Sequence, residues 1–223
     1  MPELADTTLS WLLTPMDTSQ AHAIATHQAW HGRLMFLAWG VLLPLGVLIA
    51  RYFKITPRQN WPEELDHKFW WHSHLLFQHA GVLLMLVGFA IIITNKPFAW
   101  PDEFHDYCGW FLILGGLFQF VSGYLRGTKG GPTDPSADGG LHGDHFDMTP
   151  RRIWFEGIHK AFGYILLLSG LVGVVSGLWF VNAPKWMWLT IAIVWTAFAG
   201  IAIICERKGM QTSSYEAIWG RKP

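Results

Sequence analysis

The chain has 223 residues, of which 51% are hydrophobic and only 14% are charged. A soluble domain has about a quarter charged residues, so this composition excludes an ordinary soluble globular protein. The formal net charge is zero, which gives no indication of a nucleic-acid partner, and the 14 tryptophans are typical of membrane interfaces.

Long apolar runs dominate the chain after an N-terminal arm at 1–29, which we expect to be external or interfacial. A membrane-spanning helix needs roughly 20 mainly apolar residues. Runs of this length lie at 30–50, 69–94, 105–125, 155–181 and 186–204. They are too long and continuous for barrel strands. The sequence therefore predicts an all-α integral membrane helical bundle of five transmembrane helices, with a kink at Pro44, a membrane domain at 30–205 and a tail at 206–223.

The basic residues are distributed unevenly between the connections. Most lie between the first and second spans, around the connection between the third and fourth, and in the tail: Arg51, Lys54, Arg58, Lys68, Arg126, Lys129, Arg151, Arg152, Lys160, Arg207, Lys208, Arg221 and Lys222. On the opposite side are Lys96, Lys185 and, just inside the first span, Arg33. Because cytoplasmic connections are rich in Lys and Arg, we expect the N-terminus outside and the C-terminus in the cytoplasm.

Four histidines lie near the starts of the first four spans: His31, His74, His105 and His159. Consecutive spans run antiparallel, so His31 can meet His105 near one face of the membrane and His74 can meet His159 near the other. Bundle cores commonly hold such sites between facing helices. Two histidines per site suit a haem that transfers electrons, whereas zinc or copper would need more ligands. We therefore predict a four-helix di-haem core with two haem b groups.

Glycines recur every seven residues on the faces of these histidines. His105 precedes Gly109, Gly116 and Gly123, His159 precedes Gly163, Gly170 and Gly177, and His74 precedes Gly81 and Gly88. Steps of four and seven stay on one helix face. Glycine allows a planar cofactor to approach the backbone. Packing of helix against helix is the alternative explanation for the spacing.

Several other polar residues are candidates for roles around the haems. His72 is expected at the interface, His79 to hydrogen-bond a neighbour, and Gln78 to support His74. The candidates for haem propionates or an anionic substrate are Arg33 at the outer site and Arg151, Arg152, Lys160 and Lys68 at the inner site. The connection at 127–150 is rich in Gly and Asp, and we interpret it as a flexible loop. A metal site formed by His142, Asp144, His145 and Asp147 is the alternative.

Four segments resemble the cytochrome b561 family, most closely the branch that is fused to DOMON domains. They are WHGRLMFLAWGVLLPLGVLIARYFK at 30–54, FWWHSHLLFQ at 69–78, HDYCGW at 105–110 and RRIWFEGIHKAFGY at 151–164. The resemblance implies the same histidine pairs and transmembrane electron transfer. No DOMON domain accompanies the motifs, so we expect a stand-alone protein of a bacterial inner membrane.

The resemblance leaves the electron donor and acceptor open. Quinol, ascorbate and a redox protein are the candidate donors, and membrane lipid and a second copy of the chain are further candidate partners. Two functions follow: a transmembrane oxidoreductase, or a haem-bearing anchor and electron-relay subunit of a larger complex. No residue is expected to act as a catalytic acid, base or nucleophile.

Overall fold

The computed structural model describes residues 2–20, 23–56, 58–60, 68–95, 101–126 and 150–212. The described part of the chain is helical and contains no strand. Its elements are α1 (Pro2–Leu13), α2 (Thr26–Met35), the π-helix η1 (Phe36–Leu42), α3 (Leu43–Tyr52), α4 (Phe69–Asn95), α5 (Phe104–Tyr124), α6 (Pro150–Phe180) and α7 (Lys185–Arg207).

Among the described residues, five helices are long and apolar enough to cross a membrane, as the sequence predicts. The first comprises α2, η1 and α3 as one continuous stretch, Thr26–Tyr52, and the others are α4, α5, α6 and α7. Large apolar side chains such as Leu83, Leu114 and Ile193 are exposed on their outer faces. In water these side chains would be unfavourably exposed, whereas lipid tails would cover them. The fold is therefore an all-α membrane bundle.

The predicted kink at Pro44 takes the form of a π-helical segment. Proline lacks a backbone N–H, and its ring clashes with the carbonyl of the residue four positions earlier, here Gly40. η1 precedes α3, which has Pro44 in its first turn. The wider π-turn accommodates the proline without ending the helix, and it buries Ala38, Trp39 and Gly40 in the bundle.

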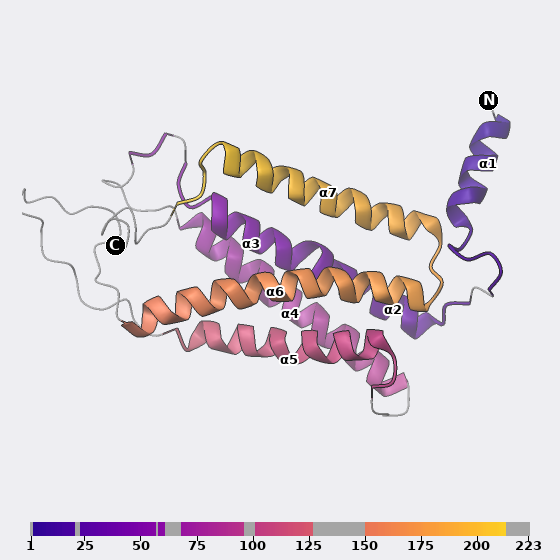
Figure 1. Cartoon of the computed structure of the whole chain (residues 1–223), viewed down its shortest axis with the longest axis horizontal. Coiled ribbons are helices and arrows are strands. Elements are labelled where there is room, and N and C mark those ends of the chain that lie inside the picture. The colour runs from indigo at the N-terminus through magenta and orange to yellow at the C-terminus, as the bar shows by residue number, and fades with distance from the viewer. Residues whose placement is uncertain are drawn as a thin grey trace, which may run out of the picture.

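The first four spans form a bundle, and α7 lies outside it (Figure 1). α4 packs against α2, η1 and α3 on one side and against α5 on the other. α6 packs against α5 and closes the ring through contacts with α2 and η1. α2 and α5 are therefore diagonal neighbours, and so are α4 and α6. The buried core between them contains Ala38, Trp39, Leu43, Val82, Met85, Leu112, Ile113 and Leu166.

The N-terminal arm contains a helix and contacts the turn between α6 and α7. In Figure 1, α1 lies at the end of the bundle, steeply inclined to its axis. Asn182 accepts a hydrogen bond from the backbone N–H of Asp17 at 3.0 Å and donates one to its carbonyl at 2.8 Å. Lys185 donates to the Thr14 hydroxyl at 2.9 Å and lies over the Trp11 ring. Asn182 has a positive φ of 46°, a conformation that asparagine tolerates better than most residues.

Candidate functional site

His31 of α2 and His105 of α5 meet across the bundle. Their ring centroids are 6.1 Å apart and their planes are nearly perpendicular, at 89°. Both residues lie near the start of their spans, which run in the same direction, at the end of the bundle that also carries α1 (Figure 1). The structure thus brings together the first pair of histidines that the sequence predicts to be neighbours.

Hydrogen bonds fix the orientation of both rings. His31 Nδ1 lies 3.0 Å from the carbonyl oxygen of Gly88, which can only accept, so Nδ1 carries the proton and donates. His105 Nδ1 lies 3.0 Å from Ser176 Oγ. The Ser176 hydroxyl donates its own hydrogen to the Gly173 carbonyl at 2.9 Å, so its oxygen accepts from His105. In each ring the lone pair is consequently on Nε2.

The His105 ring is also confined by packing. It stacks on Phe180 with an interplanar angle of 16° and a centroid distance of 6.3 Å. Gly177 lies directly beneath it, and a Cβ atom on that residue would come within 2.8 Å of His105 Cε1. Because real Cβ atoms essentially never come this close to another heavy atom, Gly177 has to lack a side chain for His105 to keep its position.

The second pair, His74 of α4 and His159 of α6, lies at the other end of the bundle. His74 Nδ1 donates to the carbonyl oxygen of Gly46 at 3.1 Å, which again leaves the lone pair on Nε2. His159 is at the same end of the bundle, on the helix that is diagonal to α4. Gln119 donates to the His159 carbonyl at 2.7 Å, and Phe155 lies against the His159 ring. A hydrogen bond thus orients the His74 ring, whereas packing against Phe155 confines the His159 ring.

These geometries fit bis-histidine haem. With metal–nitrogen bonds of about 2 Å and about 1 Å from each nitrogen to its ring centre, imidazoles on opposite sides of one iron have centroids about 6 Å apart. His31 and His105 have this separation. An Nδ1–H bonded to a fixed acceptor is the usual arrangement of a metal-binding histidine. His159 Nδ1 is buried and has no hydrogen-bond partner among the described residues, so that ring can be satisfied by a group from outside the chain.

The described residues contain no cluster of three or more His, Cys, Asp or Glu side chains that could hold a metal ion. Zinc sites use three or four such protein ligands, and di-iron sites use several carboxylates as well as histidines. Histidine pairs are enough for haem, because the porphyrin supplies the other four iron ligands.

The glycine repeats are explained mostly by contacts between helices. Gly81 faces Leu43, Gly88 faces Leu34 and Met35, Gly116 faces Met85 and Trp39, Gly163 faces Gln119, and Gly170 faces Trp39. A Cβ atom on Gly109 or Gly123 would meet no neighbouring side chain within 4 Å. Two of the predicted repeats lie against a predicted ligand histidine: Gly177 faces the His105 ring, and the Gly88 carbonyl contacts His31. The alternative explanation, helix packing, therefore accounts for Gly81, Gly88, Gly116, Gly163 and Gly170.

The other predicted site residues make local contacts. Gln78 donates to the Leu43 carbonyl at 3.2 Å and so ties α4 to α3 beside the Gly46 carbonyl that His74 uses. Arg33 lies over the Trp30 ring at the opposite end. His79, predicted to bond a neighbour, does so: its Nδ1 donates to the Leu75 carbonyl and its Nε2 accepts from the Tyr124 hydroxyl.

Basic residues gather at the His74 end. Arg152 is only 9% exposed and pairs with Glu156 at 3.1 Å, and Lys160 approaches the same carboxylate at 3.3 Å. Arg151 donates to the Leu125 carbonyl at 2.6 Å. Lys68 directly precedes α4 at the same end of the bundle. The predicted loop residues His142, Asp144, His145 and Asp147 lie outside the described residues.

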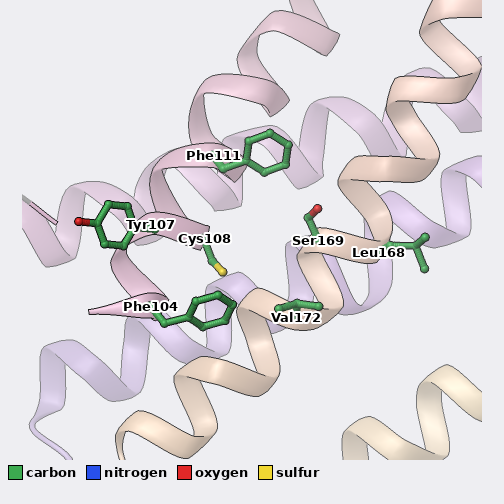
Figure 2. A pocket seen from close by; sticks show the side chains of 7 residues that line it. All are labelled: Phe104, Tyr107, Cys108, Phe111, Leu168, Ser169 and Val172. Carbon is green, nitrogen blue, oxygen red and sulfur yellow. The ribbon is translucent and has the colours of Figure 1, made fainter. Parts of the chain in front are cut away.

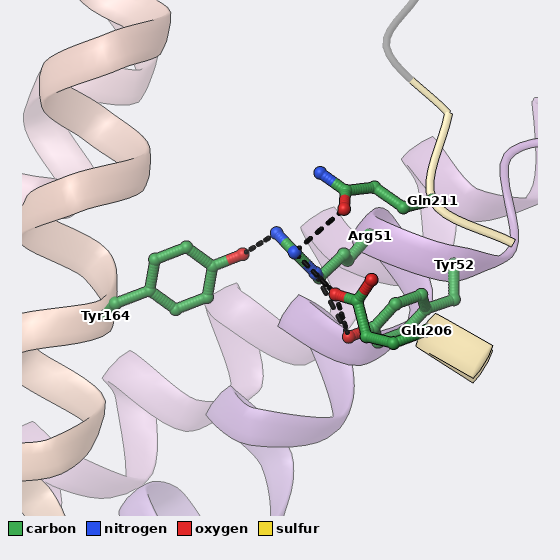
Figure 3. A network of polar contacts seen from close by, with 5 residues as sticks. All are labelled: Arg51, Tyr52, Tyr164, Glu206 and Gln211. Carbon is green, nitrogen blue, oxygen red and sulfur yellow. Dashed lines mark hydrogen bonds and ion pairs between the residues drawn. The ribbon is translucent and has the colours of Figure 1, made fainter. Parts of the chain in front are cut away.

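The sequence did not indicate a polar network at the same end, drawn in Figure 3. Arg51 of α3 donates to Glu206 of α7 at 2.6 Å, to Tyr164 of α6 at 2.8 Å and to Gln211 at 3.0 Å. Tyr52 donates to the same Glu206 carboxylate at 2.9 Å. The network ties the outer helix α7 to the bundle. Arg51 and Glu206 stand far apart in the sequence, so no spacing pattern could have paired them.

A pocket of about 400 Å³ opens between α5 and α6, one turn from His105 (Figure 2). Its lining is mainly apolar and includes Phe104, Phe111, Leu168 and Val172. Cys108 and Ser169 point toward the space between the helices, whereas the Tyr107 hydroxyl points away.

Comparisons with known proteins point to one family. The chain is 28% identical to a cytochrome b561, DM13 and DOMON domain-containing protein of Arabidopsis thaliana, over 66% of this chain and 14% of that protein. It is 27% identical to a cytochrome b561 and DOMON domain-containing protein of the same plant, over 72% of this chain and 34% of that one. These similarities support the cytochrome b561 family.

A third relative is ferric-chelate reductase 1 of Mus musculus, 33% identical over 40% of this chain and 15% of that protein. The chain thus spans about a third or less of the length of these relatives. No family model and no solved structure matches the chain.

Proposed function

We propose that this cytochrome b561-like protein carries electrons across the membrane through two b-type haems. One haem is held by His31 and His105, the other by His74 and His159. The observation that carries the proposal is the close approach of His31 and His105 from diagonal helices, with both Nδ1 atoms donating to fixed acceptors. The names of the relatives, cytochromes b561 and ferric-chelate reductases, support a redox role.

The haem iron would supply the change between the ferric and ferrous states. Hydrogen bonds at Nδ1 hold His31, His74 and His105 in the tautomer whose Nε2 would bind iron, and two histidine ligands at each site would leave no position for oxygen to bind. The partial burial of these residues would limit the access of water to the metal. Arg33 at one end, and Lys68, Arg151, Arg152 and Lys160 at the other, are our candidates to pair with propionates or with an anionic substrate.

The uneven distribution of Lys and Arg supports an orientation. Arg51, Arg126, Arg152 and Arg207 are at the end of the bundle that carries His74, whereas Lys185 is at the other end. By the positive-inside rule, the His74 end faces the cytoplasm and α1 lies outside. A location in a bacterial inner membrane, with residues 30–205 as the membrane domain, fits this arrangement.

The test is the visible spectrum of the purified protein, with haem quantified per chain, while a ubiquinol analogue and then ascorbate are added. Two haems per chain and fast reduction by quinol would support a quinol-linked reductase, and reduction by ascorbate alone would support an ascorbate donor. Reduction only by dithionite would favour an electron-relay subunit that needs a partner. A preparation without haem would refute the proposal.

Single histidine variants assign the ligands. His31→Ala or His105→Ala should remove one and the same haem, and His74→Ala or His159→Ala the other. His72→Ala is the matched control, because it changes a neighbouring histidine of α4 that has no proposed role in binding iron. Loss of haem in His72→Ala, or retention of both haems in His74→Ala, would contradict the assignment.

A further inference from the structure

Trp39 occupies the centre of the bundle. Its side chain comes from η1, is 3% exposed and belongs to the buried core. Gly170 of α6 faces it so closely that a Cβ atom there would lie 2.8 Å from Trp39 Cε3. A Cβ atom on Gly116 of α5 would lie 3.5 Å from Trp39 Cζ2. The indole therefore reaches from the first span across the bundle, and glycines on two other helices make room for it.

The level of Trp39 lies between the two histidine pairs. It follows His31 by eight residues and precedes Gly46, whose carbonyl binds His74, by seven. At the α-helical rise of about 1.5 Å per residue, which the π-helical segment shortens, these separations are at most about 12 and 10 Å along the helix axis. On α6, Gly170 likewise lies between His159 and Gly177, which is beneath His105. Trp39 thus stands in the layer that separates the two sites.

Packing alone gives no reason for tryptophan at this position. The indole Nε1 is buried and has no hydrogen-bond partner among the described residues. An unsatisfied buried N–H is unfavourable, and buried Trp N–H groups usually find a partner. An aliphatic side chain would fill the layer without this cost, as Met85 does next to it at 0% exposure. What tryptophan adds is a large conjugated ring system.

We propose that Trp39 is the bridge through which electrons pass between the two haem sites. The proposal rests on the proposed function, because it needs both haems. Electron transfer slows steeply as the gap widens, and it slows less where conjugated, close-packed groups fill the gap. In the step, the ferrous iron at one site loses one electron and the ferric iron at the other gains it. Trp39 is neither oxidised nor reduced, and no proton moves.

The test compares three core variants of the full chain in nanodiscs. Trp39→Leu removes the ring system, Trp39→Phe keeps an aromatic ring, and Met85→Leu changes the neighbouring core residue without touching an aromatic group. A short light pulse with a membrane-impermeant photoreductant on one side reduces the nearer haem first. The second spectral phase then reports equilibration between the haems. The haem-to-protein ratio and the two midpoint potentials are measured for each variant.

We expect Trp39→Leu to slow the second phase by about tenfold or more, which corresponds to about 1.4 kcal/mol in the effective barrier. Trp39→Phe should recover most of the rate, and Met85→Leu should keep it. The haem-to-protein ratio and the two midpoint potentials of each variant should equal those of the wild type. If Trp39→Leu loses haem, Trp39→Met, which is long and flexible but lacks the ring, takes its place in the comparison.

Two outcomes would overturn the proposal that Trp39 is the bridge. One is a second spectral phase in Trp39→Leu that is as fast as in the wild type, and the other is a second phase in Met85→Leu that is slowed as much as in Trp39→Leu. The first would show that the ring is not the path, and the second that general core packing sets the rate. Failure of the proposed function has a different signature, because the wild-type protein would then contain fewer than two haems. The two proposals can therefore fail separately.

Discussion

Ser176 provides the sharpest test of how the histidines are held. His31 and His74 donate to backbone carbonyls, which no side-chain substitution removes. His105 instead donates to the Ser176 hydroxyl at 3.0 Å. Ser176→Ala deletes this acceptor and leaves the ring, its stacking on Phe180 and the backbone of α6 in place. The variant therefore changes one haem site and not the other.

The expected magnitude follows from the role of the bond. Removal of a hydrogen-bond partner behind a metal-binding histidine typically lowers metal affinity by about 10- to 100-fold, or about 1.4 to 2.7 kcal/mol. The bond also makes the imidazole a stronger electron donor, which stabilises ferric iron. Its loss should therefore raise the midpoint potential of the haem that His105 binds. The haem bound by His74 and His159 should keep its potential.

Redox titration with haem quantification measures both effects. Ser122→Ala is the matched control, because the Ser122 hydroxyl donates to the Gln119 carbonyl and contacts neither pair of histidines. Two unchanged potentials with full haem content in Ser176→Ala would refute the proposed tautomer of His105. A shift in both potentials, or an equal shift in the control, would contradict the separation of the two sites.

Three further variants test the bundle itself. Gly170→Ala should destabilise the protein by about 1–3 kcal/mol and lower its melting temperature, because the added Cβ collides with Trp39. Its control is Gly157→Ala, which adds a Cβ in open space on the same helix and should leave the melting temperature unchanged or raise it. Arg51→Ala should lower stability by only about 0.5–1 kcal/mol, since Arg51 and Glu206 are 30% and 42% exposed, and it should keep both haems; loss of haem would show that the network reaches the second site. Asn182→Ala should release the arm from the turn before α7, measured as faster proteolysis between α1 and α2, with Asn95→Ala, at the end of α4, as its control.

Hydropathy predicted the five spans because lipid demands long apolar helices. It placed their ends less well. The first span begins at Thr26 rather than at residue 30, and α6 begins at Pro150 rather than at residue 155. The added turns carry polar residues such as Gln28 and Arg152. Helical hydrogen bonds continue past the apolar segment, and a hydropathy pattern cannot register them.

The approach of His31 to His105 could be predicted, because alternating spans fix which residues share a membrane depth. The acceptors behind the rings could not, because Gly46 and Gly88 act through backbone carbonyls, which every residue has. Six of the eight glycines in the repeats mark close approaches, whereas Gly109 and Gly123 do not, and a missing side chain does not reveal what approaches. At Gly170 the neighbour is Trp39. The π-helix that carries Trp39 likewise has no sequence signature beyond the proline that follows it.

The hydrogen bonds of the histidine rings lie within two helical hairpins, one formed by the first two spans and the other by α5 and α6. His31 of α2 donates to α4, and His74 of α4 donates to α3, so the first two spans hold each other's rings before any later helix arrives. His105 and Ser176 link α5 to α6 in the same way. On the proposed ligation, each haem takes one histidine from each helical hairpin. On that ligation, the two haems would link the two helical hairpins to each other. Hairpins inserted one after the other would then become one cytochrome only when haem binds.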